Sequence, residues 1–167
     1  MSNFKGARMK LVIGSLEDKS LDVTAQYNPK ELPVSKSVAW TPHAHRVVEF
    51  GDEQGREMTV ELLFDGYEAK QSVMTQLLKL DQMSSPIDRE STNVSRRRPH
   101  RCVMVWGDKM ERIACVITSV ETKFVMWNDD GLPVRATATV KLKEIDVYAM
   151  LHAEQDRESA RARPRAR

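Results

Sequence analysis

The sequence lacks any long hydrophobic run. No apolar stretch approaches the roughly 18 residues that a membrane-spanning helix needs, and residues 1–10 lack the hydrophobic centre of an export signal. Neither membrane insertion nor export is expected, so synthesis in a cytoplasm is predicted. Cysteine is scarce as well: Cys102 and Cys115 are the only two, which argues against a disulfide scaffold and predicts two reduced thiols.

The sequence also lacks the short motifs that carry catalysis or cofactors. It has no glycine-rich phosphate loop, no strand-elbow serine, no paired cysteine motif and no helical pair of metal ligands. His43 and His45 could join Cys102 or His100 at a zinc ion. Structural zinc sites use four ligands at compact spacing, so surface histidines are the favoured interpretation.

Three carboxylates, Glu57, Glu61 and Asp65, recur at strand spacing. They could serve acid–base chemistry, but they fall on the side of a predicted strand where polar residues belong in any case. We therefore expect no catalytic residue, no cofactor, no metal site and no small-molecule substrate.

The net charge is small and unevenly distributed. The chain carries +2 overall, and the segment 151–167, with five arginines against three acidic residues, accounts for all of it. Residues 1–150 are therefore neutral and offer no broad attraction for nucleic acid. A second basic cluster, Arg96, Arg97, Arg98 and Arg101, borders a long polar segment. Three interpretations of this cluster are open: a solvated loop, a contact with a protein partner, or a contact with nucleic acid.

Two long alternating runs, 111–127 and 133–145, flank an Asn-Asp-Asp-Gly turn. In the second run Val134, Ala136 and Ala138 fall on one face, whereas Arg135 and Thr137 fall on the other. The Asp-Gly step supplies the positive φ angle that a tight reversal needs. The pattern predicts a β-hairpin with unusually long arms and one polar face.

Other segments complete a mainly β domain. Strands are predicted at 9–14, 21–26 and 57–65, and an edge strand at 35–40. A further strand, at 101–107, is predicted to be buried on both faces. Loops are predicted at 41–56, which contains Pro42, Gly51 and Gly55, and at 84–100. The period near 3.6 over 67–83 predicts one amphipathic helix that packs on the sheet. The fold class is α+β, mainly β: an antiparallel β-sandwich or barrel over residues 1–148, followed by an arginine-rich tail, 149–167, that is a frayed helix or disordered.

Four blocks in this order are similar to the tube-type baseplate proteins of contractile injection systems, which are related to phage tail tube proteins. The blocks read YNPKEL at 27–32, MTVELLFDGYE at 58–68, RPHRCVMVWG at 98–107, and ITSVETKF at 117–124 with DGLPVRATA at 130–138. Together they span about residues 9 to 146. The resemblance is to the tube initiator or spike–tube adaptor group of that family.

The resemblance implies a non-enzymatic structural component. Such a protein forms a hexameric ring that joins the inner tube protein to the trimeric spike hub protein, beside other baseplate subunits, and initiates tube assembly. It would be made in the bacterial cytoplasm and end in a phage-tail-like particle. Another phage-tail or virion structural role, and less favourably a nucleic-acid-binding β-barrel, are the alternatives. Members often continue into a peptidoglycan-binding-type module, where this sequence has the arginine-rich tail, for which docking on an acidic surface is one hypothesis.

Related tube subunits contribute four strands each to a barrel that lines a channel, and six copies would supply about 24 strands, enough for an aqueous lumen. The half-polar segments 21–26, 57–65, 111–127 and 133–145 match that number. The residues expected to face the lumen are Asp22, Thr24, Glu57, Thr59, Glu61, Ser119, Glu121, Lys123, Arg135, Thr137, Thr139 and Lys141. The residues expected to contact partners are Trp127, Arg96, Arg97, Arg98, Arg163, Arg165 and Arg167.

Overall fold

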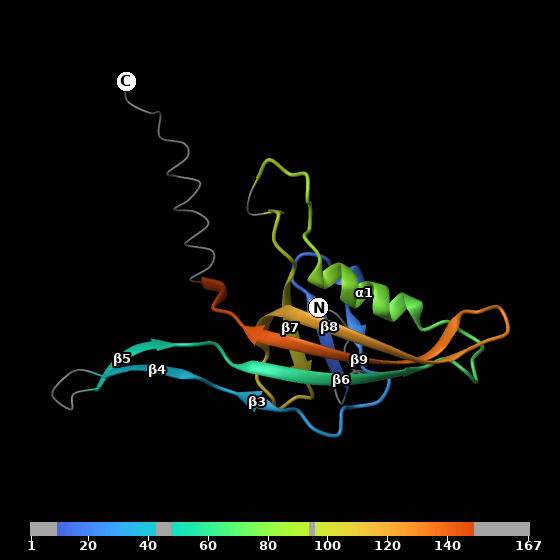
Figure 1. The fold of residues 1–167 in the computed structure, drawn as a ribbon, viewed down its shortest axis with the longest axis horizontal. Coiled ribbons are helices and arrows are strands. Elements are labelled where there is room, and N and C mark those ends of the chain that lie inside the picture. Colours follow the sequence, from blue (N-terminus) through green and yellow to red (C-terminus); the bar gives the residue numbers. More distant parts are fainter. Residues whose placement is uncertain (1–9, 43–47, 94–95, 149–167) are drawn as a thin grey trace.

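The computed structural model describes residues 10–42, 48–93 and 96–148. Its main element is a seven-stranded antiparallel sheet in the order β2-β1-β7-β8-β9-β6-β3, beside a separate two-stranded ribbon, β4-β5 (Figure 1). The sheet is open, and one helix, α1, packs on it. The predicted class, mainly β with one helix and a long C-terminal hairpin, is confirmed, whereas the described residues do not close the sheet into the predicted barrel. The strands are β1 Leu11–Ser15, β2 Val23–Thr24, β3 Val34–Ser35, β4 Val38–Pro42, β5 Val48–Glu53, β6 Glu57–Asp65, β7 Arg101–Trp106, β8 Ile113–Trp127 and β9 Pro133–Glu144.

The β8–β9 hairpin is present as predicted. Its turn is closed by the Asn128 N–H, which donates to the Leu132 carbonyl at 2.9 Å, and Gly131 adopts a φ of 78°. Strand β6 pairs along its whole length with β9, from Glu57 opposite Lys143 to Asp65 opposite Arg135. Strands β8, β9 and β6 therefore form one long three-stranded unit.

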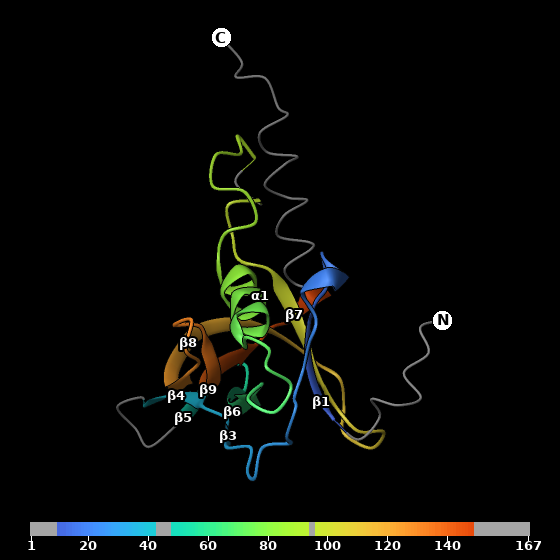
Figure 2. The same ribbon diagram turned by 90° about the vertical axis from the view of Figure 1, so that its right-hand side faces the viewer.

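The core lies between this sheet and α1. Alternate side chains of β6 and β9 are buried, and they share the core with residues of β1, β7 and the first half of β8. Figure 2 shows the sheet curving beneath α1, with β8 and β9 on one side of the helix, β6 below it, and β7 and β1 on the other side. The buried members of β6 and β9 are Met58, Val60, Leu62, Phe64, Val134, Ala136, Ala138, Val140 and Leu142.

Helix α1 spans Met74–Ser84, a shorter range than the predicted 67–83. Leu77, Leu80 and Met83 form its buried stripe, as the period of 3.6 requires. The preceding residues instead fold into a turn, in which the Gln71 N–H donates to the Gly66 carbonyl at 3.0 Å. Ser72 then accepts the Met74 N–H with its side chain, which satisfies a backbone donor of the first helical turn.

Three local predictions are wrong. The strand expected at 21–26 is a 3₁₀ turn, Lys19–Leu21, followed by the two-residue strand β2; Asp18 caps that turn by accepting the Ser20 N–H. The loop expected at 41–56 contains β5, which pairs with β4 as a projecting ribbon. Strand β7 buries Cys102 and Met104 fully, but its other face is only half-buried.

The segment at 85–93 and 96–100, termed here the arginine arm, is a long loop as predicted, and it projects from the body (Figure 1). Its two sides run antiparallel: Pro86 bridges Pro99, and the Ile87 N–H donates to the Arg98 carbonyl at 3.0 Å. Backbone hydrogen bonds therefore give the base of this loop the character of a ribbon.

A charged clamp fixes the junction between β5 and β6 to the end of β9. The Arg56 guanidinium donates to both carboxylate oxygens of Glu144, at 2.9 and 2.6 Å, and the Arg56 N–H donates to the same group at 3.0 Å. Gly55 permits this approach, because a Cβ there would lie 2.3 Å from the Glu144 carbonyl oxygen. The clamp therefore sets where the β4-β5 ribbon leaves the sheet.

We predict that Glu144→Gln lowers the free energy of unfolding by about 1 kcal/mol at neutral pH, because the pair is partly exposed to solvent. The hydrogen bonds from Arg56 lower the pKa of Glu144 to about 2, from an ordinary value of 4.5. A depressed folded-state pKa contributes stability above pH 4.5 that is lost as the pH falls towards 2. Denaturant unfolding across that range should show the wild-type advantage shrinking.

Glu111→Gln is the matched control. Glu111 lies 3.5 Å from the same guanidinium but its side chain is 76% exposed, so this substitution should change stability little at any pH. Equal effects of the two substitutions would contradict the role given to Glu144.

Candidate assembly surfaces

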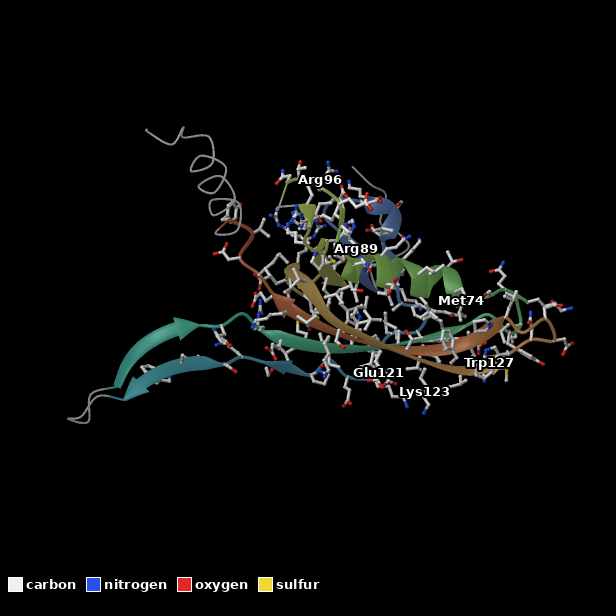
Figure 3. All side chains as sticks on the ribbon, turned by 45° about the horizontal axis from the view of Figure 1, so that its top comes forward. Met74, Arg89, Arg96, Glu121, Lys123 and Trp127 are labelled. Carbon is white, nitrogen blue, oxygen red and sulfur yellow. The ribbon has the colours of Figure 1, made fainter. Side chains whose placement is uncertain are left out.

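One face of the three long strands carries almost only polar side chains, and we term it the polar face. Strand register places its residues in rows that run across β6, β9 and β8, on the side of the sheet opposite the core. Figure 3 shows Glu121 and Lys123 pointing away from α1. The three central rows are Thr59–Lys141–Ser119, Glu61–Thr139–Glu121 and Leu63–Thr137–Lys123.

The two end rows of the polar face are closed by ion pairs. Lys143 lies 3.7 Å from Glu57 at one end, and Arg135 donates to Asp65 at 2.9 and 2.7 Å at the other. The Tyr67 N–H and then the Arg135 guanidinium hold the pKa of Asp65 below its ordinary value. Both end rows are therefore internally neutralised.

A β-bulge in β8 puts Ser119 on this face. Ile113, Cys115 and Ile117 are buried, so strict alternation would carry residue 119 into the core as well. The register shifts between Ile117 and Ser119 instead, which reverses the alternation from that point on. The bulge thereby aligns the second half of β8 with the polar faces of β9 and β6.

Asp22 and Thr24 do not lie with the other residues expected to face a lumen. They belong to the short strand β2 and the turn before it, at the far edge of the sheet, with β1 and β7 between them and β8. Burial raises the pKa of the Asp22 carboxyl, and a Cβ on Gly14 would lie only 2.5 Å from its Oδ1 atom. The Asp22 side chain thus packs closely against Gly14 of β1.

Two strand edges of the long unit lack a full-length partner strand within the part of the chain that the structure describes. Strand β7 pairs with β8 only as far as Arg101 opposite Val116, so β8 has no second strand neighbour from Thr118 to Trp127. On the other side, β3 pairs with β6 only at Val34 opposite Met58 and Ser35 opposite Glu57. Unpaired backbone groups of this kind are ready to accept another strand.

Exposed apolar side chains flank the polar turn at the free end of the β8–β9 hairpin. Trp127 is 56% exposed, and its ring centroid lies 6.5 Å from that of Phe124; Figure 3 shows Trp127 at this end of the molecule. Tyr67 and Leu132 are exposed as well, and the hydrogen bond from the Gly66 N–H to the Val134 carbonyl holds their two loops together. An exposed aromatic group of this size is typical of a contact surface.

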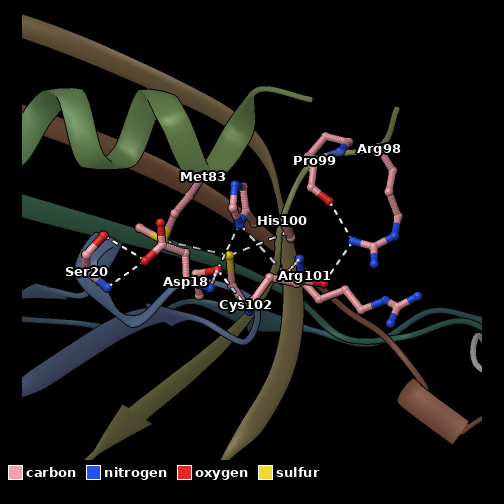
Figure 4. Close-up of polar contacts among 10 residues, drawn as sticks. Asp18, Ser20, Met83, Arg98, Pro99, His100, Arg101 and Cys102 are labelled. Atoms are coloured by element: carbon pink, nitrogen blue, oxygen red, sulfur yellow. Dashed lines mark hydrogen bonds and ion pairs between the residues drawn. The ribbon is translucent and has the colours of Figure 1, made fainter. Parts of the chain in front are cut away.

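The three arginines of the arm that are predicted to contact partners differ in their surroundings. Arg98 pairs with Glu17 at 3.0 Å and donates to the Pro99 carbonyl, as Figure 4 shows. Arg97 donates to the Ser91 carbonyl at 2.7 Å, and Arg96 is exposed. The arm thus uses Arg98 to hold its own base, whereas Arg96 and Arg97 reach solvent. Arg163, Arg165 and Arg167 lie outside the described residues, as do His43 and His45.

A buried polar cluster anchors the base of the arm to the end of β1. The Ser15 hydroxyl oxygen accepts the N–H groups of Glu17 and Asp18, at 3.2 and 3.0 Å, and lies 2.8 Å from His100 Nδ1. Glu17 also accepts the Arg101 N–H at 2.9 Å.

The described residues show little that could do chemistry. They contain no cluster of three or more metal-ligating side chains, and none of their helices has the length and apolar character to cross a membrane. Cys102 and Cys115 lie opposite each other across β7 and β8 as free, fully buried thiols. Burial raises the pKa of each to about 12, so both are poor nucleophiles in the folded protein.

We predict that Glu17→Ala loosens the arginine arm, because Glu17 holds both Arg98 and the Arg101 N–H. Limited trypsin digestion should then cut at Arg89, Arg96 or Arg97 faster than in the wild type, by about fivefold for each kcal/mol lost from the closed arm. Glu90→Gln, on the exposed part of the same arm, is the control and should leave the cleavage rate unchanged. Equal rates for Glu17→Ala and wild type would show that Glu17 does not anchor the arm.

No curated protein matches the chain in a sequence search. The family model described as contractile injection system tube protein matches residues 9–151, a range that contains the sheet, the helix and the arm. With a polar sheet face, open strand edges and a match over most of its length, the chain belongs to the contractile injection system tube protein family.

Proposed function

We propose that this protein forms a hexameric ring that joins the inner tube to the trimeric spike hub of a phage-tail-like particle and initiates tube assembly, without catalysing a reaction. The observation that carries the proposal is the long three-stranded unit, β8-β9-β6, with a polar face and an open edge on each side. A single chain leaves that unit incomplete, whereas a closed ring pairs its edges.

Strand direction supports a ring built from four strands per copy. Strands β8 and β6 point the same way, because each is antiparallel to β9. Direct joining of β6 to the β8 of a neighbour would therefore be a parallel contact in an antiparallel sheet. The segment that ends in β3 runs antiparallel to β6, and as a fourth strand it meets the neighbouring β8 in the antiparallel sense. Six copies then give about 24 strands, which enclose an aqueous lumen.

The polar face is the proposed lining of that lumen, and α1 lies on the outside of the ring. Asp22 and Thr24 are left out, because their strand lies beyond β1 and β7. The fourth strand comes from residues 26–35 in place of 21–26. The lining then consists of Glu57, Thr59, Glu61, Ser119, Glu121, Lys123, Arg135, Thr137, Thr139 and Lys141.

The two ends of the molecule are the proposed contacts with the inner tube protein, the spike hub protein and other baseplate subunits. The apolar end around Trp127 and the exposed arginines Arg96 and Arg97 are the features suited to them. The particle would be assembled in the bacterial cytoplasm, where the chain is made.

Oligomeric mass is the first test. Six copies of the 19.1 kDa chain give a particle of about 115 kDa, which light scattering and negative-stain images would detect with the protein alone or with its tube and hub partners. A chain that stays monomeric under all of these conditions would contradict the proposal.

Cysteine labelling tests which face lines the lumen. Cys102 and Cys115 are buried, so an introduced thiol is the reactive one. In the ring, Asp81→Cys on the outer side of α1 should accept a large polymer maleimide on every copy. Thr139→Cys on the polar face should accept it on only some copies, because six such polymers do not fit in one lumen. In the separated chain both should label fully. Equal labelling of the two variants in the ring would place the polar face elsewhere.

A further inference from the structure

The side chain of Gln26 imitates a neighbouring strand. Its Nε2 atom donates to the Asp65 carbonyl at 2.7 Å, and its Oε1 atom accepts the Asp65 N–H at 2.8 Å. This pair of bonds is the one that two strand residues exchange in a hydrogen-bonded antiparallel pair. One primary amide thus satisfies both backbone groups at the last residue of β6.

The Gln26 amide holds one end of a segment that follows the edge of β6. At the other end Ser35 lies opposite Glu57 and Val34 opposite Met58, and the Thr59 N–H donates to the Pro33 carbonyl at 3.2 Å. Residue 35 is thus beside 57 and residue 26 beside 65, so the segment runs antiparallel along the strand. Pro29 and Pro33 lack N–H donors, which prevents a complete ladder between these two ends.

The other groups at this end of β6 keep Asp65 in place. The Asp65 carboxylate is bonded to Arg135 and to the Tyr67 N–H, so its backbone is presented to Gln26 in a fixed position. A side chain bonded to backbone in this way is a positional constraint, because the primary amide presents a donor and an acceptor side by side to the carbonyl and the N–H of one residue.

We propose that Gln26 is a positioning residue that fixes which strand edge the next copy of this chain meets. With the segment 26–35 pinned at both ends, the β8 edge of a neighbour meets that segment in the antiparallel sense. Without the pin at Asp65, the edge of β6 opens to direct parallel pairing with β8, which would give rings of the wrong strand number or open aggregates. The inference rests on the proposed ring.

Two variants and a control test it in the full-length chain. Gln26→Leu removes both bonds, and Gln26→Glu keeps the acceptor but replaces the donor with an oxygen that faces the Asp65 carbonyl. Asn28→Ala is the control: it removes a side-chain bond from the same segment, the one that the Leu11 N–H makes to Asn28 Oδ1, without touching β6. The readouts are hydrogen exchange of the Asp65 amide in dilute, unassembled protein and the size distribution of assembled particles.

Gln26→Leu should raise the exchange rate of the Asp65 amide about tenfold or more, with no change at the paired residue Val60 in the middle of β6. Gln26→Glu should raise it less, because it keeps the acceptor of the Asp65 N–H. Both variants should also broaden the single ring population into mixed sizes or aggregates, while Asn28→Ala does neither. Unchanged exchange at Asp65 would overturn the pin itself. Faster exchange with an unchanged ring population would overturn its role in assembly. A wild type that forms no rings would overturn the proposed function, and the exchange result alone would then decide whether Gln26 holds the edge.

Discussion

Unpaired backbone groups along two long strand edges are the constraint on which the rest of this structure depends. Strands β8 and β6 are the outer members of a unit that β9 holds together from end to end, yet neither has a full-length partner on its other side among the described residues. Exposed edges of this length favour aggregation unless they are covered or closed. The partial fourth strand covers both ends of the β6 edge. The proposed ring would pair the edges that remain, and its lumen would be lined by the polar face.

Periodicity predicted the parts of the fold in which each strand obeys one rule throughout. Strands β6 and β9 alternate strictly, so their bounds and their buried faces could be assigned from the sequence. The buried stripe of α1 could likewise be predicted from the 3.6-residue period. These elements bury their apolar residues in the shared core. The spacing of apolar residues in the sequence predicts which face of an element is buried.

The sequence could not reveal features that depend on contacts between distant residues. The bulge before Ser119 is visible only as a register shift against β9, and the pattern Ile117-Thr118-Ser119 gives no signal for it. The segment 26–35 contains two prolines and reads as a break, yet Gln26 and Ser35 tie it to β6 across the chain. Strand β5 contains Gly51, a residue that is depleted in strands, which made the ribbon look like a loop.

The charges of the polar face bear on what a lumen lined by it would carry. Its end rows are closed by the pairs Glu57–Lys143 and Asp65–Arg135. Between the end rows lie three rows whose charged residues are Lys141 in the first, Glu61 and Glu121 in the second, and Lys123 in the third. Two positive charges therefore balance two negative charges in each copy. A neutral lining of alternating sign releases few counterions from a polyanion. The polar face therefore fits the proposed structural channel better than the alternative of a nucleic-acid-binding barrel.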